Sequence, residues 1–130
     1  MAIPEEVEIL YLRRIARRDH TPIKIRTGTK LPAYCTSTGK AILAFSPLEL
    51  VAAVFQKMVL KPLTGKTITD KAQFENALAT VRAKRFAWSD EELSVSNLPM
   101  AALILDQHGY ALAAVNAGAP TINCTLAQFI

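Results

Sequence analysis

The stretch LPAYCTSTGKAILA, residues 31–44, decides where the first helix of this chain begins and what lies at its start. Three hydroxyl residues, Thr36, Ser37 and Thr38, precede an apolar run in it. Short polar side chains cap helices because the first N–H groups of a helix have no partner within it. Gly39 adds no side chain, so another backbone or a ligand can approach closely. The pattern predicts a helix after Ser37 that lies inside the fold, because its residues are apolar nearly all round.

Such a helix start has a chemical use as well as a structural one. It carries partial positive charge and unpaired donors, so it can hold a carboxylate or a phosphate. Ser37 and Thr38 are therefore candidate binding residues for a small anion. The alternative is that both side chains only cap the helix, and spacing alone leaves the two interpretations open.

Length and composition indicate one globular domain. The chain has 130 residues, within the usual size of a domain, and 51% of them are hydrophobic. No apolar run approaches the roughly 18 residues that a membrane span needs. Glu5, Glu6 and Glu8 occupy the place of the apolar core of a signal peptide, so we expect a cytoplasmic protein.

The net charge is +4, and the tightest basic cluster is formed by Arg13, Arg14, Arg17 and Arg18. We interpret this cluster as part of a solvated turn. It lacks a helix-turn-helix pattern and interleaved aromatic residues, which are the usual marks of a nucleic-acid reader. DNA recognition by this stretch is therefore not expected.

Strand-like and helix-like segments are mixed along the chain. The expected strands are 7–15, 23–27, 86–88, 99–105 and 110–115; the expected helices follow Ser37, run from Ser46 to about Lys57, and follow Asp70. Ser46 and Asp70 are the expected caps of the second and third helices. The segment 61–69 is an expected loop, and 89–92 an expected solvated acidic loop. A closing hairpin with a turn at 106–109 completes a predicted α+β fold, in which helices pack on an antiparallel sheet.

Several motifs, taken in order, resemble the effector-binding domain of IclR-type bacterial transcription regulators. They are an opening strand at 8–17, the 31–44 stretch of the form L-P-A-Y-C-T-S-x-G-[KR], L-T-x-x-T-I-T at 63–69, the aromatic and acidic turn FAWSDEE at 86–92, and the hairpin at 101–114. The spelling of 31–44 is most similar to regulators of aromatic-acid catabolism. The resemblance implies a GAF- or profilin-like sheet that senses a small molecule and is not an enzyme.

The resemblance also implies where a ligand binds. The implied effector-binding residues are Ser37, Thr38, Gly39, Ser89, Pro99, Asn116 and Gly118. The implied ligand is a small carboxylic acid, aromatic or keto acid. Its anion would meet the helix start, and its apolar body would contact Leu43, Leu98 or Met100. Asn116 and Gly118 are expected to follow the last strand, and no metal or other cofactor is implied.

Assembly is a third implication of the resemblance. Domains of this family pair, so a homo-oligomer, a dimer or tetramer, is expected, with exposed apolar residues such as Leu10 or Leu12 contributing. The winged helix-turn-helix domain of the family normally precedes this region. Residues 1–130 are therefore expected to be a single effector-binding domain fragment that meets DNA only through that other domain. The helix that usually closes the domain is expected to be cut off near Ile130.

One segment departs from the family pattern. Just before the first hairpin strand, the family often has glycine, an apolar residue, arginine, and then serine or cysteine. Here residues 96–99 read SNLP. The five donors of arginine are lost, and Pro99 has no N–H to offer a ligand.

The rival hypothesis is a small-molecule, hydrolase-like enzyme that uses Cys35 as nucleophile, with His20 or His108 as base. A catalytic cysteine needs a lowered pKa and an oriented base, and no motif indicates either. A buried structural thiol is the favoured interpretation of Cys35. Cys35 and Cys124 lack C-x-x-C spacing, which favours reduced thiols over a disulfide or a zinc site.

Overall fold

The computed structural model describes residues 1–15, 25–121 and 125–129 of the chain. Its strands are β1 (Ala2–Glu5), β2 (Glu8–Tyr11), β3 (Lys30–Pro32), β4 (Ala87–Trp88), β5 (Asn97–Leu105) and β6 (Ala111–Pro120). Its helices are α1 (Ser37–Ala44), α2 (Leu48–Lys57), α3 (Lys71–Lys84) and the four-residue α4 (Leu126–Phe129). The expected α+β class is confirmed.

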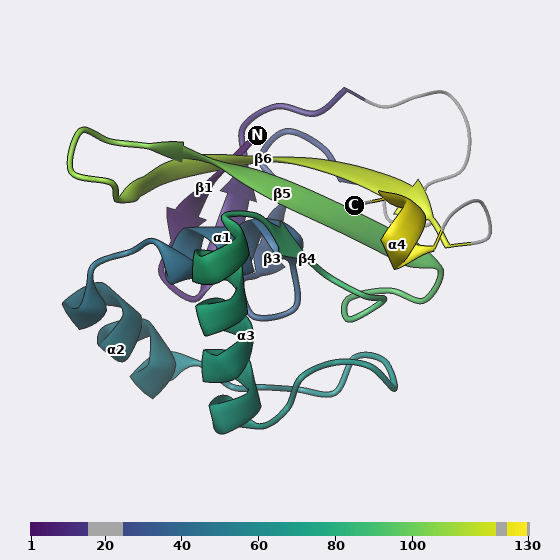
Figure 1. Cartoon of the computed structure of the whole chain (residues 1–130), viewed down its shortest axis with the longest axis horizontal. Helices are drawn as coiled ribbons and strands as arrows, with labels where there is room; N and C mark the ends of the chain where they lie inside the picture. The colour runs from purple at the N-terminus through teal and green to yellow at the C-terminus, as the bar shows by residue number, and fades with distance from the viewer. Residues whose placement is uncertain (16–24, 122–124, 130) are drawn as a thin grey trace.

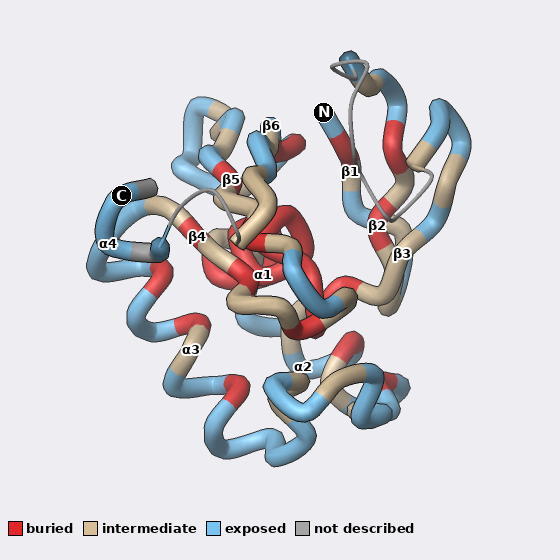
Figure 2. Tube along the Cα trace, turned by 90° about the vertical axis from the view of Figure 1, so that its right-hand side faces the viewer, coloured by how far each residue is buried: buried red, intermediate tan, exposed pale blue. Residues whose placement is uncertain are grey.

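The strands form one antiparallel sheet in the order β3-β2-β1-β6-β5-β4. Helices α1, α2 and α3 lie on the same side of the long β5–β6 hairpin, as Figure 1 shows. Helix α1 packs against β5, β6 and α3, so it lies at the centre of the core. All eight of its residues are buried, and they form the main buried segment in Figure 2.

The predicted opening strand at 7–15 is wrong in its extent. Only β2, residues 8–11, lies within that segment; a further strand, β1, precedes it and pairs with β2 from Ala2↔Tyr11 to Glu5↔Glu8. Glu6 makes the turn between them with a φ of 53°. Strand β1 was missed because proline and glutamate are depleted in strands. Of the strand predicted at 23–27, residues 25–27 are not in a strand, and Ile23 and Lys24 lie outside the described residues.

Helix α1 begins at Ser37 as the sequence predicts, and its N-cap is Thr36. The Thr36 hydroxyl accepts a hydrogen bond from the N–H of Gly39 at 3.1 Å. Gly39 fits here because the helix start presses against the preceding loop. A Cβ atom on Gly39 would lie 2.2 Å from the carbonyl oxygen of Ala33. The close approach predicted for Gly39 is thus made by backbone.

The second and third helices differ in how they are capped. The predicted Ser46 cap of α2 is wrong, because the Ser46 hydroxyl donates back to the carbonyl of Ile42 at 2.7 Å. The N-cap position of α2 is Pro47, which has no side-chain acceptor. The Asp70 cap of α3 is confirmed: its carboxylate accepts from the N–H of Gln73 at 3.1 Å. The tie to Ile42 joins the end of α1 to the start of α2.

The closing hairpin is confirmed and is longer than predicted. Strands β5 and β6 pair from Asn97↔Pro120 to Leu105↔Ala111. Asn116 and Gly118 therefore lie within β6. The prediction that they follow the last strand is wrong. Small residues and a proline at 117–120 look like a loop in sequence, because glycine and proline usually interrupt strands. Pairing with β5 extends the strand through them.

Candidate functional site

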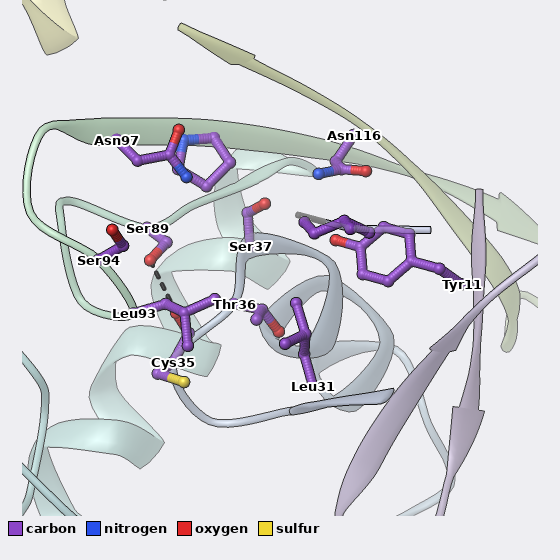
Figure 3. A pocket seen from close by; sticks show the side chains of 12 residues that line it. Tyr11, Leu31, Cys35, Thr36, Ser37, Ser89, Leu93, Ser94, Asn97 and Asn116 are labelled. Carbon is purple, nitrogen blue, oxygen red and sulfur yellow. Dashed lines mark hydrogen bonds between the residues drawn. The ribbon is translucent and has the colours of Figure 1, made fainter. Parts of the chain in front are cut away.

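A cavity lies beside the start of α1, between the β5–β6 hairpin and β2 (Figure 3). Its volume is about 30 Å³, enough for about two water molecules. Its walls are formed by Tyr11, Ile25, Leu31, Cys35, Thr36, Ser37, Ser89, Leu93, Ser94, Asn97, Pro99 and Asn116. No ionised side chain is among them, so its polar groups are neutral hydroxyls, amides and backbone.

Four of the seven effector-binding residues predicted from the sequence line this cavity: Ser37, Ser89, Pro99 and Asn116. The other three do not line it, and neither do the apolar residues Leu43, Leu98 and Met100 that were expected to contact the ligand. Thr38 is fully buried beside Tyr11, and Gly39 faces the backbone of Ala33. Gly118 faces the side chains of Asn97 and Pro99.

Ser37 differs from the other polar residues at the cavity in its hydrogen bonding. It is buried, yet its hydroxyl has no hydrogen-bond partner among the described residues. The Thr36 hydroxyl accepts a hydrogen bond from the N–H of Gly39, and the Thr36 carbonyl accepts one from the N–H of Lys40. The N–H groups of Ser37 and Thr38 have no acceptor in the described part of the chain. A buried unpaired polar group costs about 1–3 kcal/mol, so this helix start is suited to a ligand that supplies an acceptor.

Ser89, which lines the cavity, is hydrogen-bonded to two neighbouring segments. Its hydroxyl donates to the carbonyl of Cys35 at 2.9 Å, and its N–H donates to the carbonyl of Pro99 at 3.0 Å. Figure 3 shows the first of these bonds. Ser89 thus ties the segment before α1 to β5 and is already hydrogen-bonded in this structure.

Tyr11 also lines the cavity, although it is not among the binding residues predicted from the sequence. It is 4% exposed, and its hydroxyl lies 3.5 Å from the hydroxyl of Thr38. Burial raises the pKa of Tyr11, while Thr38 and Asn116 act to lower it. The phenol therefore stays neutral over the physiological range. Alternation was the available signal, because β2 buries Ile9 and Tyr11 on one face.

The segment 89–97, here called the strap, borders the cavity and contributes Ser89, Leu93, Ser94 and Asn97 to its wall. Two residues in it, Glu91 and Ser96, have positive φ values of 55° and 67°. The Glu91 carboxylate accepts from the N–H of Ser96 at 2.8 Å, which lowers the pKa of Glu91. The Glu91 N–H donates to the carbonyl of Asn97 at 3.1 Å. The strap is a closed loop held by its own ends.

The prediction that residues 89–92 form a solvated acidic loop is wrong for Glu92. The Glu92 carboxylate pairs with the ammonium of Lys40 at 2.6 Å, and the two side chains are only 7% and 5% exposed. Burial raises the pKa of Glu92, and the Lys40 charge opposes that rise. The second carboxylate oxygen of Glu92 has no partner among the described residues. This pair anchors the strap to α1.

Two threonines of the 63–69 stretch hold the strap from the other side. The Thr64 hydroxyl donates to the carbonyl of Glu91 at 2.7 Å, and the Thr67 hydroxyl donates to that of Glu92 at 2.6 Å. The Thr67 oxygen also accepts from the N–H of Thr64 at 2.9 Å. The L-T-x-x-T-I-T stretch therefore supports the wall of the cavity without lining it.

The environment of Cys35 does not favour a nucleophile. Its side chain is fully buried, and burial raises the pKa of the thiol to about 12. The thiolate is the reactive form of cysteine, so this shift opposes attack. His108 lies in the exposed turn between β5 and β6, and His20 lies outside the described residues. No cluster of metal-binding side chains occurs among the described residues.

Comparison with known proteins places the chain in a family. Residues 1–128 match the family described as "Bacterial transcriptional regulator IclR C-terminal". The p-hydroxybenzoate hydroxylase transcriptional activator of Acinetobacter baylyi is 35% identical over 96 residues, which are 74% of this chain and 35% of the activator. The Pca regulon regulatory protein of Pseudomonas putida is 32% identical over 117 residues, which are 89% of this chain and 40% of that protein.

Solved structures agree with the fold. A transcriptional regulator from Rhodococcus has a TM-score of 0.93 at 33% identity, covering 98% of this chain and 51% of that chain. The inducer-binding domain of PobR from Acinetobacter, solved as a double mutant in complex with 3-hydroxybenzoic acid, has a TM-score of 0.81 at 30% identity. The match covers 97% of this chain and 74% of that chain.

The chain spans well under half of the two curated relatives, both of which are regulators of transcription. None of the described helices is long and apolar enough to cross a membrane. Both the sequence and the fold of this chain match those of IclR-type regulators over nearly its whole length. This chain belongs to the family of C-terminal domains of IclR-type bacterial transcriptional regulators.

Proposed function

We propose that residues 1–130 form the ligand-sensing domain of an IclR-type transcription regulator, and that the cavity binds a small carboxylic acid, aromatic or keto acid. The observation that carries this proposal is the start of α1. Ser37 is buried there with an unpaired hydroxyl, beside N–H groups that have no acceptor in the described chain. A carboxylate accepts several hydrogen bonds and is favoured by the positive end of a helix.

The two relatives and the PobR domain support the aromatic class, because their names refer to hydroxybenzoate compounds or to a Pca regulon. The lining is also suited to an apolar body: Ile25, Leu31 and Leu93 face the cavity. Since no cation lines it, the anion would be held by neutral donors alone. Binding should therefore depend more on hydrogen-bond geometry than on salt concentration.

The size of the cavity adds a requirement. A volume of about 30 Å³ is too small for a benzoate-sized acid, so the wall must move when such a ligand enters. Within the strap, the wall residues Leu93 and Ser94 lie between two residues with positive φ, Glu91 and Ser96. We infer that Leu93 and Ser94 shift outward on binding while Ser37 stays fixed in α1.

Calorimetry against benzoates, phenylacetates and keto acids tests the proposal. Ser37→Ala and Asn116→Ala should each weaken the tightest-binding acid by about 1 kcal/mol or more, through one lost hydrogen bond. Asn76→Ala, an exposed change on α3, is the matched control and should leave binding unchanged. Absence of heat and of thermal shift with every acid would refute the proposal.

We also infer that the chain self-associates. Several large apolar side chains in and beside the sheet are exposed: Leu12 is 38% exposed, Leu112 56% and Val115 49%. Leu10, the other residue expected to contribute, is half-buried in β2. A symmetric dimer is the simplest assembly. Light scattering over a range of concentrations should give twice the monomer mass, and a constant monomer mass at high concentration contradicts the inference.

A further inference from the structure

Helix α2 has one face packed on the core and one face left open. Val54 and Met58, the residue after the helix, are buried, and the Phe55 ring centroid lies 5.5 Å from that of Phe74. Four apolar residues of α2 are nevertheless exposed: Leu48, Leu50, Ala52 and Ala53. In Figures 1 and 2 the helix lies at the margin of the molecule. The described part of the chain therefore leaves the outer face of α2 uncovered.

A stripe along this outer face has a symmetrical charge pattern. Glu49, Ala53 and Lys57 are four residues apart, so they lie on one side of the helix. Glu49 is in the first turn and Lys57 in the last, and neither forms an ion pair with another described residue. Opposite charges at equal distances from a small central residue make the stripe complementary to an antiparallel copy of itself.

A hollow borders the stripe, between α2 and the turn that joins β1 to β2. Its volume is about 100 Å³, and its walls are formed by Glu6, Val7, Leu50, Ala53, Val54 and Lys57. Residues 50 and 56 are equally far from residue 53. In an antiparallel copy centred on Ala53, Leu50 of the partner subunit therefore lies level with Gln56, over the side of the hollow between Ala53 and Lys57. An aliphatic side chain that enters a mainly apolar hollow is a typical anchor of an interface.

We propose that two copies of this chain associate through the outer faces of their α2 helices, which run antiparallel with Ala53 of each at the two-fold axis. This inference rests on the self-association proposed above and assigns a surface to it. Each Glu49 pairs with Lys57 of the partner subunit, and each Leu50 enters the partner's hollow. A partner of a single charge sign would match only one end of the stripe, whereas a second copy matches both.

Sedimentation of the whole chain over a range of concentrations measures the dissociation constant of the dimer. Glu49→Lys and Lys57→Glu each place like charges opposite one another at two symmetric sites, so each should weaken the dimer about tenfold. The variant with both changes restores opposite charges across the axis and should recover most of this loss. Glu75→Lys makes the same charge change at an exposed position of α3 and is the matched control.

Cross-linking tests the position of the axis. In a Cys124→Ser background, Ala53→Cys should give a disulfide-linked dimer on mild oxidation, because the two introduced thiols face each other. Gln56→Cys is on the same helix but lies opposite Leu50 of the partner subunit, so it should give no cross-link.

The proposal is overturned if the single reversals bind as tightly as the Glu75→Lys control, if the double change gives no recovery, or if Ala53→Cys does not cross-link. A dimer that Leu112→Ser on β6 dissociates and the α2 variants do not would also overturn it. All of these results leave self-association standing. A chain that stays monomeric overturns both the interface and self-association, and leaves the proposed binding of a small acid untouched.

Discussion

At the start of α1, a single missing side chain sets how closely the helix can approach the loop before it. The Cβ of an alanine at Gly39 would lie 2.2 Å from the Ala33 oxygen, 2.4 Å from its Cα and 2.6 Å from its carbonyl carbon. These are backbone atoms, so the clash cannot be relieved by rotating a side chain. The helix start, and with it Ser37, would have to move.

Gly39→Ala should therefore destabilise the fold by about 2–3 kcal/mol, since overpacking a tight site costs an amount of that order. Urea unfolding measures this change. Gly65→Ala is the control, because nothing lies within 4 Å of an added Cβ there and its φ is ordinary. A Gly39→Ala protein as stable as the Gly65→Ala protein would contradict the packing described for α1.

Cys35 provides a second prediction at this scale. Burial raises the pKa of its thiol to about 12, well above the ordinary value of 9.0. The neutral thiol is therefore favoured by folding. Its contribution to stability is complete below about pH 9 and is lost as the pH rises through about 12. Between pH 6 and 9 the folded protein should hold Cys35 as an unreactive thiol.

Thiol labelling measures the reactivity of Cys35, and a Cys124→Ser variant is used so that Cys35 is the only thiol in the sequence. Modification of Cys35 should be slow and should become fast when denaturant is added. Fast labelling of the folded protein, rising steeply between pH 6 and 8, would contradict the buried-thiol assignment and revive a nucleophilic role.

Among the elements, the strap links the cavity to the rest of the fold. It is held on one side by the buried pair of Lys40 and Glu92, and on the other by hydroxyls from the 63–69 stretch. The first contact joins the strap to helix α1, and the other two join it to the 63–69 loop. Most of the strap therefore depends on a few polar contacts, and these contacts determine how easily it can open.

Thr67→Val should loosen the strap. The change removes a donor to the Glu92 carbonyl and an acceptor for the Thr64 N–H, at a cost of about 1–2 kcal/mol. Hydrogen exchange should become faster at the amides of Glu91 and Ser96, which are bonded within the strap.

Thr69→Val, a change at an exposed threonine two residues along the chain, is the control. Equal exchange in the two variants would show that the 63–69 stretch does not support the strap.

For the molecule as a whole, several of the described basic residues are bonded to other groups of the chain. Lys30 pairs with Glu5 at 2.7 Å, and Lys66 pairs with Asp90 at 3.3 Å. Arg14 donates to the carbonyl of Ile25 at 2.6 Å. Arg17 and Arg18 of the predicted cluster lie outside the described residues. Pairing of lysines with nearby carboxylates reduces the positive electrostatic potential that would attract a nucleic acid.

We therefore expect this 130-residue chain to show negligible sequence-specific DNA binding. We propose that operator recognition belongs to a winged helix-turn-helix domain of the full regulator. Gel-shift titrations with operator and random duplexes should give the same weak, phosphate-driven association, which falls steeply as salt is raised. Retention of one duplex over the others at physiological salt would contradict this expectation.

The sequence by itself predicts several features that depend on hydrogen bonds between residues close together in the chain. The start of α1 at Ser37, the Asp70 cap and the β5–β6 hairpin all depend on residues close together in the chain. Caps and turns form from neighbouring donors and acceptors, so a single sequence contains them. At Ser46 the local signal predicted a cap for the following helix, but the hydroxyl donates to the preceding helix instead.

Tertiary structure decided what surrounds the cavity. Tyr11 meets Thr38 from 27 residues away, and Lys40 meets Glu92 from 52 residues away. Alternation in β2 marks Tyr11 as buried, but no local pattern places it at the cavity or marks Glu92 as buried, because these arrangements arise only when distant segments pack together. Where α1 begins is thus a property of the sequence, whereas which residues face Ser37 across the cavity is a property of the folded chain.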